Sequence, residues 1–131
     1  MSARSSPLAK VLIFSAIAEI ATGIGLVVAP AFVVTSLLAP VTSPLVIPVA
    51  RIAGIALIAL GLACWTGWNR VGDGAFRALL TYNLLVAAYL ALLGTAGQMR
   101  GLLLWPAVAL HAAVTAMVLL FWKTETSRPS S

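Results

Sequence analysis

The sequence predicts an all-α integral membrane protein, a four-transmembrane-helix bundle with a short interfacial helix between spans one and two. Hydrophobic residues make up 62% of the chain and charged residues only 8%, whereas a soluble domain averages about 25% charged residues. Four apolar runs are each long enough to cross the roughly 30 Å hydrocarbon core of a bilayer. The 131 residues suit a single domain, 1–131. The spans are predicted at about residues 8–29, 45–66, 75–93 and 102–122.

The first span follows a small polar segment, residues 1–7, and ends at Ala29-Pro30. A cleaved signal peptide is the competing interpretation. We disfavour it because the apolar run is longer than the hydrophobic part of a signal peptide, contains Glu19 and lacks a clear small-x-small cleavage site.

Residues 30–48 contain four prolines and no charge. The stretch 31–39 between two of these prolines is too short to cross a bilayer. It is predicted to be a short helix closed by proline at each end. The sequence leaves open whether residues 30–44 lie flat in the interface or re-enter the membrane.

The second span begins with Pro44 or Pro48, because proline is tolerated in the first turn of a helix. Arg51 lies one or two turns inside this span. The polar segment 67–74, rich in glycine, is a predicted loop.

The third span begins near Arg77, and a second glycine-containing loop covers residues 94–101. The fourth span carries Pro106 in its first turn, where it should kink the helix little. Residues 123–131 form a predicted polar tail.

The basic residues predict the orientation of the chain. A cytoplasmic N-terminus places six basic residues inside and one in an outside loop, a distribution that the positive-inside rule favours. Both termini are therefore predicted to be cytoplasmic. The net charge of +5 is explained by this orientation, and no nucleic-acid partner is expected. The inside residues are Arg4, Lys10, Arg70, Arg77, Lys123 and Arg128, and the outside residue is Arg100.

Each predicted span carries a polar side chain at depth. With a rise of about 1.5 Å per residue, Glu19, Asn83 and His111 lie about 13–15 Å from the outer ends of their spans. Arg51 and Tyr89 lie about 6–11 Å deep. An ionised carboxylate inside a membrane is costly unless it is paired, so we expect Arg51 to pair with Glu19. The candidate site is this polar core: Glu19, Arg51, Tyr82, Asn83, Tyr89 and His111.

Small residues accompany the polar ones on the predicted helix faces. Ser15, Glu19, Thr22 and Gly23 follow the i, i+4, i+7, i+8 spacing and share one stripe. Arg51 shares a stripe of the second span with Gly54, Ile58 and Gly61. Small side chains allow helix backbones to approach in a membrane, so these stripes predict the bundle interior.

The polar core has two open interpretations. It is either a set of polar contacts that only stabilises helix packing or a functional pocket, such as a proton relay, an ion site or a small-ligand site. A metal or haem site needs two or more ligands, and the chain has one histidine and one cysteine. No metal, cofactor or catalytic motif is predicted. Cys64 is interpreted as a small buried apolar residue that has no internal disulfide partner.

One local stretch resembles the small multidrug resistance transporters, which are four-span proteins. Ala18-Glu19-Ile20 is similar to their motif around an essential glutamate, and Trp65-Thr66-Gly67 is similar to their Trp-Ser-Gly. The resemblance implies a substrate-binding glutamate beside a stacking tryptophan. The chain departs from that pattern because Trp65 ends span two, whereas the family has its tryptophan within span three. Arg51 and His111 have no counterpart there.

The whole chain resembles the small four-helix bacterial inner-membrane proteins of the DoxX-like kind. The matching features are Glu19 to Gly23 in span one, Arg51 to Gly54 in span two, and the lone His111 in the last span. This resemblance implies a membrane accessory protein, sometimes linked to redox partners, and assigns no catalytic residue.

The predicted function is that of a non-enzymatic accessory or ligand-binding membrane subunit built on Glu19, Arg51, Asn83 and His111. We expect the protein to lie in the lipid bilayer of the bacterial inner membrane. There it is expected to form a homo-oligomer or to be a subunit of a larger membrane complex. The alternative is a proton-coupled small-molecule transporter or channel in which Glu19 is the titrating residue.

Overall fold

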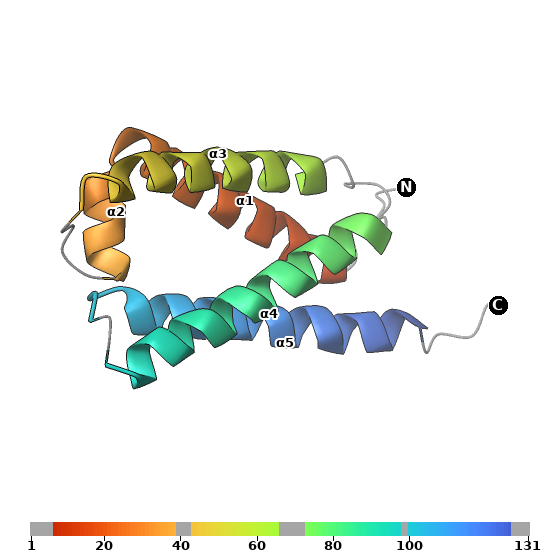
Figure 1. Cartoon of the computed structure of the whole chain (residues 1–131). Helices are drawn as coiled ribbons and strands as arrows, with labels where there is room; N and C mark the ends of the chain where they lie inside the picture. The colour runs from red at the N-terminus through yellow and green to blue at the C-terminus, as the bar shows by residue number, and fades with distance from the viewer. Residues whose placement is uncertain (1–6, 39–42, 66–72, 98–99, 127–131) are drawn as a thin grey trace.

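The computed structural model describes residues 7–38, 43–65, 73–97 and 100–126, and within these ranges every regular element is a helix (Figure 1). Most of the predicted polar start, most of the loop after the second span and the end of the tail lie outside the described residues, and so do the predicted inside residues Arg4, Arg70 and Arg128. The helices are α1 Pro7–Val28, α2 Pro30–Leu37, α3 Val46–Trp65, α4 Asp73–Thr95 and α5 Leu104–Thr126.

Four of these helices, α1, α3, α4 and α5, are long and apolar enough to cross a membrane. The predicted all-helical, four-span fold class is therefore confirmed, and each predicted span overlaps one of these helices. The predicted short helix is also present as the eight-residue α2. It begins at Pro30, where the missing proline N–H costs no hydrogen bond.

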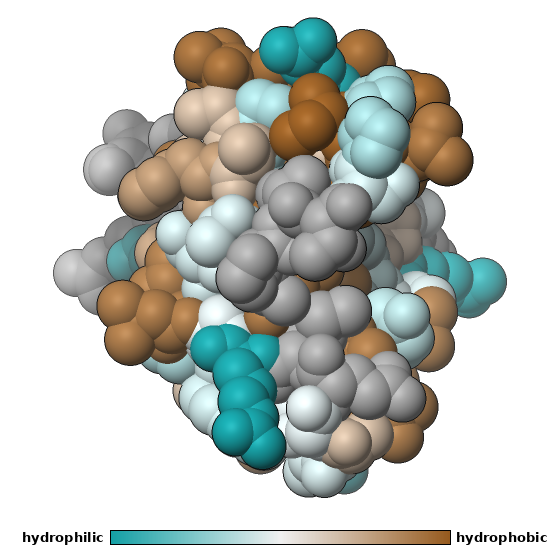
Figure 2. Space-filling view, turned by 60° about the vertical axis from the view of Figure 1, so that its left-hand side comes forward, coloured by the Kyte–Doolittle hydropathy of each residue, from teal (hydrophilic) through white to brown (hydrophobic). Residues whose placement is uncertain are grey.

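The outer faces of the spanning helices are hydrophobic. Hydrophobic residues, brown in Figure 2, lie mainly along the edges of that view. On the four long helices Phe14, Ile52, Leu84 and Leu120 are each more than half exposed. Exposed apolar faces of this extent are unfavourable in water and match the hydrocarbon of a bilayer.

Helices α1 and α3 pack along each other, and glycines bring their backbones close together at several points. A Cβ atom added to Gly54 would lie 2.6 Å from the carbonyl oxygen of Gly23. A Cβ atom added to Gly61 would lie 2.7 Å from the carbonyl oxygen of Ala16. These contacts show that the two helices run antiparallel, with the predicted small residues at their interface.

Helices α4 and α5 form the second pair, and the two pairs meet at the end of the bundle where both termini lie (Figure 1). Aromatic stacking closes this end, with the rings of Phe76 and Trp122 4.1 Å apart between centroids. Buried hydrophobic side chains from all four long helices fill it. They are Leu8, Leu12, Ala16, Cys64, Phe76, Leu79, Val114 and Val118.

At the opposite end the pairs diverge and α2 lies across the opening (Figure 1). Backbone hydrogen bonds attach α2 to the start of α5. The Arg100 N–H donates to the Leu38 carbonyl at 2.8 Å, and the Leu103 N–H donates to the Ser36 carbonyl at 2.7 Å. Gly101 packs directly on the backbone of Leu37, where no Cβ atom would fit. One end of the bundle is therefore tightly packed, and the other is spanned by a short, anchored helix.

Candidate functional site

A layer of polar side chains separates the tightly packed end of the bundle from the end under α2. Four of its members are almost completely buried: Ser15 is 1%, Glu19 3%, Asn83 1% and Thr115 7% exposed. Tyr82 and His111, also in this layer, are half-buried. We call these six residues the polar layer: Ser15, Glu19, Tyr82, Asn83, His111 and Thr115.

Asn83 of α4 connects three helices within the polar layer. Its side-chain amide nitrogen donates to the Ser15 hydroxyl of α1 at 3.1 Å and to the Leu79 carbonyl at 2.8 Å. Its amide oxygen lies 2.8 Å from Nδ1 of His111 on α5. All hydrogen-bonding atoms of this amide thus have partners, as expected for a polar side chain that is out of contact with water.

Glu19 has its hydrogen-bond partner on α4. The Tyr82 hydroxyl and the Glu19 carboxyl group share a side-chain hydrogen bond. The Tyr82 ring also meets the His111 ring edge to face, with centroids 5.8 Å apart and an interplanar angle of 77°. The phenol therefore joins the buried carboxyl group to the histidine, a contact that offsets part of the cost of removing the carboxyl from water.

The expected ion pair between Arg51 and Glu19 is not formed, and the described residues show Arg51 exposed on α3. The register of α1 against α3 explains why. Because Gly54 meets Gly23 and the helices are antiparallel, Arg51 lies near the level of Leu26. Glu19 lies about seven residues farther along, or roughly 10 Å.

Tyr89 also lies apart from the polar layer, since 61% of its surface is exposed. Of the predicted site residues, the structure brings together Glu19, Tyr82, Asn83 and His111. Sequence reasoning did not include Ser15 or Thr115 in the site. Their spacing could have indicated both. Ser15 lies one helical turn before Glu19 and Thr115 one turn after His111, so each shares a helix face with a site residue.

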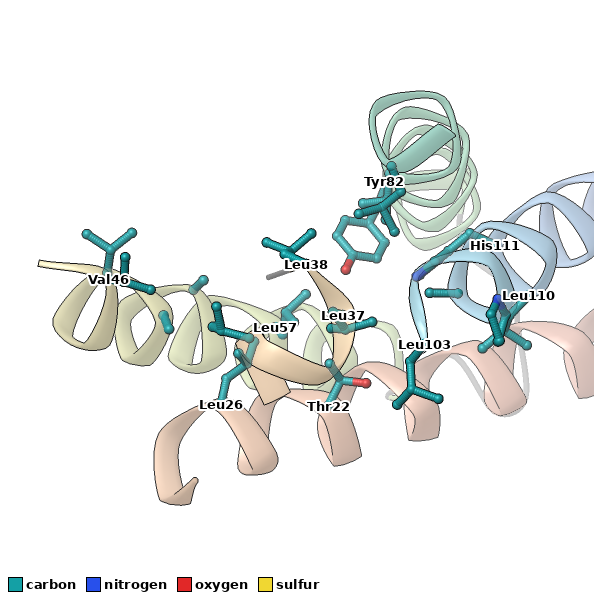
Figure 3. A pocket seen from close by; sticks show the side chains of 18 of the residues that line it. Thr22, Leu26, Leu37, Leu38, Val46, Leu57, Tyr82, Leu103, Leu110 and His111 are labelled. Carbon is teal, nitrogen blue, oxygen red and sulfur yellow. The ribbon is translucent and has the colours of Figure 1, made fainter. Parts of the chain in front are cut away.

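A cavity of about 700 Å³ adjoins the polar layer between the two helix pairs. Helix α2 forms one of its walls, and within the described residues α3 and α5 do not pack against each other across it. Figure 3 shows Leu37 of α2 and the adjoining Leu38 at the cavity together with side chains from the four long helices. The cavity is open to the outside of the protein, which is lipid for a membrane-spanning bundle.

Only three of the residues that line this cavity have polar side chains: Thr22, Tyr82 and His111. The Tyr82 hydroxyl and a His111 ring nitrogen point into the same space (Figure 3). The remaining lining is aliphatic. It consists of Leu26, Val34, Leu37, Leu38, Leu45, Val46, Val49, Ala50, Ala53, Leu57, Val86, Leu90, Leu103, Pro106, Ala107 and Leu110.

The arrangement offers hydrogen bonding rather than metal ligation. Among the described residues, no three histidine, cysteine, aspartate or glutamate side chains gather at one place. Cys64 is buried at the packed end, with its sulfur 4.0 Å from the Ala75 carbonyl oxygen. The polar layer can hydrogen-bond a polar group that enters the cavity, and its carboxyl group can hold a proton.

Comparisons with models of protein families, with characterised proteins and with solved structures found no match to this chain. The cavity and the polar layer are thus the features that bear on function.

Proposed function

We propose that this protein is a non-enzymatic, multi-pass membrane protein that binds a small apolar molecule in the cavity under α2. The observation that carries the proposal is the cavity itself: about 700 Å³, with aliphatic walls and two polar side chains, Tyr82 and His111, pointing into one space. Small-molecule sites typically measure 300–1,000 Å³ and combine an apolar lining with a few placed polar groups.

The route of access supports a ligand that dissolves in lipid. The cavity is open, and lining residues such as Val49 and Leu110 are 64% and 42% exposed. In a bilayer these side chains face hydrocarbon, so a molecule dissolved in the membrane reaches the cavity without crossing water. Its apolar part replaces lipid against aliphatic side chains, and its polar part gains partners that lipid tails do not provide.

The distribution of basic residues supports an orientation. Lys10, Arg77 and Lys123 lie near the packed end of the bundle and are exposed, whereas Arg100 lies beside α2. By the positive-inside rule the packed end and both termini are cytoplasmic, and the cavity opens into the outer leaflet. We place the protein in the bacterial inner membrane, as its resemblance to DoxX-like proteins implies, as a homo-oligomer or as an accessory subunit of a larger complex.

Photolabelling in lipid nanodiscs tests the binding site. The probe is hexadecan-1-ol with a diazirine in the middle of its chain, and labelled residues are mapped by mass spectrometry. We expect labels on cavity residues of α3 and α5. Ala107→Phe should reduce this labelling because Ala107 lines the cavity. The matched control is Ala113→Phe, which adds the same side chain on an exposed part of α5.

Two results would contradict ligand binding in the cavity. One is labelling that follows only the lipid-facing surfaces of the helices. The other is an equal effect of Ala107→Phe and Ala113→Phe on the labelling of cavity residues. Folding of both variants is checked by size-exclusion chromatography in detergent.

The contact between Glu19 and Tyr82 favours a second candidate, a proton-coupled transporter or channel. Glu19 is buried, and its partner Tyr82 lines the cavity, so one hydrogen bond separates a proton-holding group from the ligand space. In proteoliposomes with a pH gradient, a transporter would show proton flux that Glu19→Gln abolishes. Equal flux in the wild type, Glu19→Gln and empty liposomes excludes this candidate.

A further inference from the structure

Asn83 determines which ring nitrogen of His111 carries a proton. A backbone carbonyl can only accept a hydrogen bond, so the Asn83 side-chain atom 2.8 Å from the Leu79 carbonyl must be the amide nitrogen. The other side-chain atom is then the carbonyl oxygen, which can only accept. Because this oxygen lies 2.8 Å from His111 Nδ1, Nδ1 must carry the hydrogen.

His111 therefore presents an acceptor to the cavity. A neutral imidazole has one N–H, and with that hydrogen on Nδ1 the second nitrogen, Nε2, has a free lone pair. Within the described residues the His111 ring makes its hydrogen bond through Nδ1 and meets the Tyr82 ring edge to face, and neither contact uses the Nε2 lone pair. His111 lines the cavity, and a ring nitrogen points into it in Figure 3.

Tyr82 adds a second acceptor beside the first. Its hydroxyl has a single hydrogen, and while this hydrogen is donated to Glu19 the phenolic oxygen can only accept. Thr22, the third polar lining residue, has a hydroxyl that can donate or accept, so it does not select between ligands. While Tyr82 donates to Glu19, the polar groups of the cavity thus provide two acceptors and no donor that is fixed toward the ligand.

From this geometry we infer that the cavity selects an apolar molecule with a hydroxyl group, an alcohol or a phenol, whose O–H donates to Nε2 of His111. The inference rests on the proposed ligand-binding function and names the chemical class of the ligand. Ethers, esters, ketones and carboxylates only accept hydrogen bonds and would leave Nε2 unpaired. An ammonium group can donate, but the cavity lining includes no carboxylate to balance its charge.

The test compares two competitors that differ in one hydrogen-bond donor. Wild-type protein in nanodiscs is labelled with the diazirine-bearing hexadecan-1-ol in the presence of unlabelled hexadecan-1-ol or its methyl ether. Competitor amounts are expressed as mole fraction in the bilayer, so that differences in partitioning cancel. We expect the alcohol to displace the label at a mole fraction lower than that of the ether by on the order of tenfold.

Two variants connect this preference with His111. His111→Leu removes the acceptor and should abolish the difference between alcohol and ether. His111→Gln should retain it, because a glutamine amide can donate to the Asn83 oxygen and present its own carbonyl oxygen to the cavity. Retention in His111→Gln separates loss of the acceptor from general damage to the polar layer.

The outcomes distinguish the two proposals. If the alcohol and the ether displace the label equally in the wild type, ligand binding stands and hydroxyl recognition is overturned. If His111→Leu folds and keeps the full preference for the alcohol, His111 is not the recognising group and the inference also fails. If the cavity residues are not labelled at all, the binding function fails and the inference fails with it.

Discussion

Replacing Gly54 by alanine tests the backbone contact that fixes the register of α1 and α3. The added Cβ would lie 2.6 Å from the Gly23 carbonyl oxygen and 2.8 Å from Leu26 Cβ. Ordinary contacts to a Cβ atom begin near 3.4 Å, so the helices must separate by about 3.4 − 2.6 = 0.8 Å. A gap of 0.5–1 Å forfeits a quarter to a half of the dispersion attraction between the atoms concerned.

The expected cost of Gly54→Ala follows from two opposing effects. Overpacking a tight interface typically costs about 1–3 kcal/mol, while alanine is favoured over glycine inside a helix by up to about 1 kcal/mol. We expect a net loss of about 1–2 kcal/mol in the free energy of unfolding. The assay is reversible unfolding in mixed micelles with increasing sodium dodecyl sulfate, followed by circular dichroism.

Gly74→Ala is the matched control, because the Cβ that it adds near the start of α4 has no atom of the described residues within 4 Å apart from its chain neighbours and its own helix backbone. This variant should be as stable as the wild type or slightly more stable. The reasoning is refuted if Gly54→Ala and Gly74→Ala unfold at the same detergent composition, or if Gly54→Ala is the more stable of the two.

Three further predictions concern the polar layer, the attachment of α2 and the exposed arginine. A double-mutant cycle with Asn83→Leu and His111→Leu should give a coupling of about 0.6 kcal/mol, the average for hydrogen bonds between membrane helices, and at most about 1.7 kcal/mol; additive losses would contradict the bond. Gly101→Ala should separate α2 from the start of α5, and the Leu103 amide hydrogen should then exchange faster by mass spectrometry; unchanged exchange would show that the contact is not limiting. Arg51→Ala should change the unfolding free energy by less than about 0.5 kcal/mol, and a loss above 2 kcal/mol would mean that Arg51 stabilises a buried group.

Most of the fold could be predicted from the sequence because a membrane simplifies the problem. Backbone polar groups in lipid must be satisfied within each segment, so long apolar runs become helices. The rise per residue then places Glu19, Asn83 and His111 at one depth, and the structure brings these three together with Tyr82 in one layer.

The partner of Glu19 could not be predicted in the same way. Its choice between Arg51 and Tyr82 depends on the offset of α3 along α1 and on the rotation of α4 about its axis. Both are set by contacts between distant residues, such as Gly23 with Gly54, rather than by the pattern within one helix. Because α3 is offset along α1 by about two turns from the register that would pair Arg51 with Glu19, Arg51 is exposed.

The cavity was beyond sequence reasoning for a related reason. It exists because α2 lies across the diverging helix pairs and is attached to the start of α5 by backbone hydrogen bonds. Ser36 and Leu38 make these bonds with residues more than sixty positions later in the chain. Backbone hydrogen bonds leave no trace in the pattern of side chains. The length and the prolines of this segment therefore predicted a short helix but not its attachment to the chain before α5.

The attachment of α2 also sets an order of events during synthesis. Chains are made from the N-terminus, so α1, α2 and α3 enter the membrane before the residues that anchor α2 exist. The glycine contacts between α1 and α3 can form at this stage, whereas the bonds from the Arg100 and Leu103 amides must wait for the start of α5. A nascent chain released before α5 would hold a packed helix pair and an unanchored α2, and the cavity would be completed only when α5 has been added.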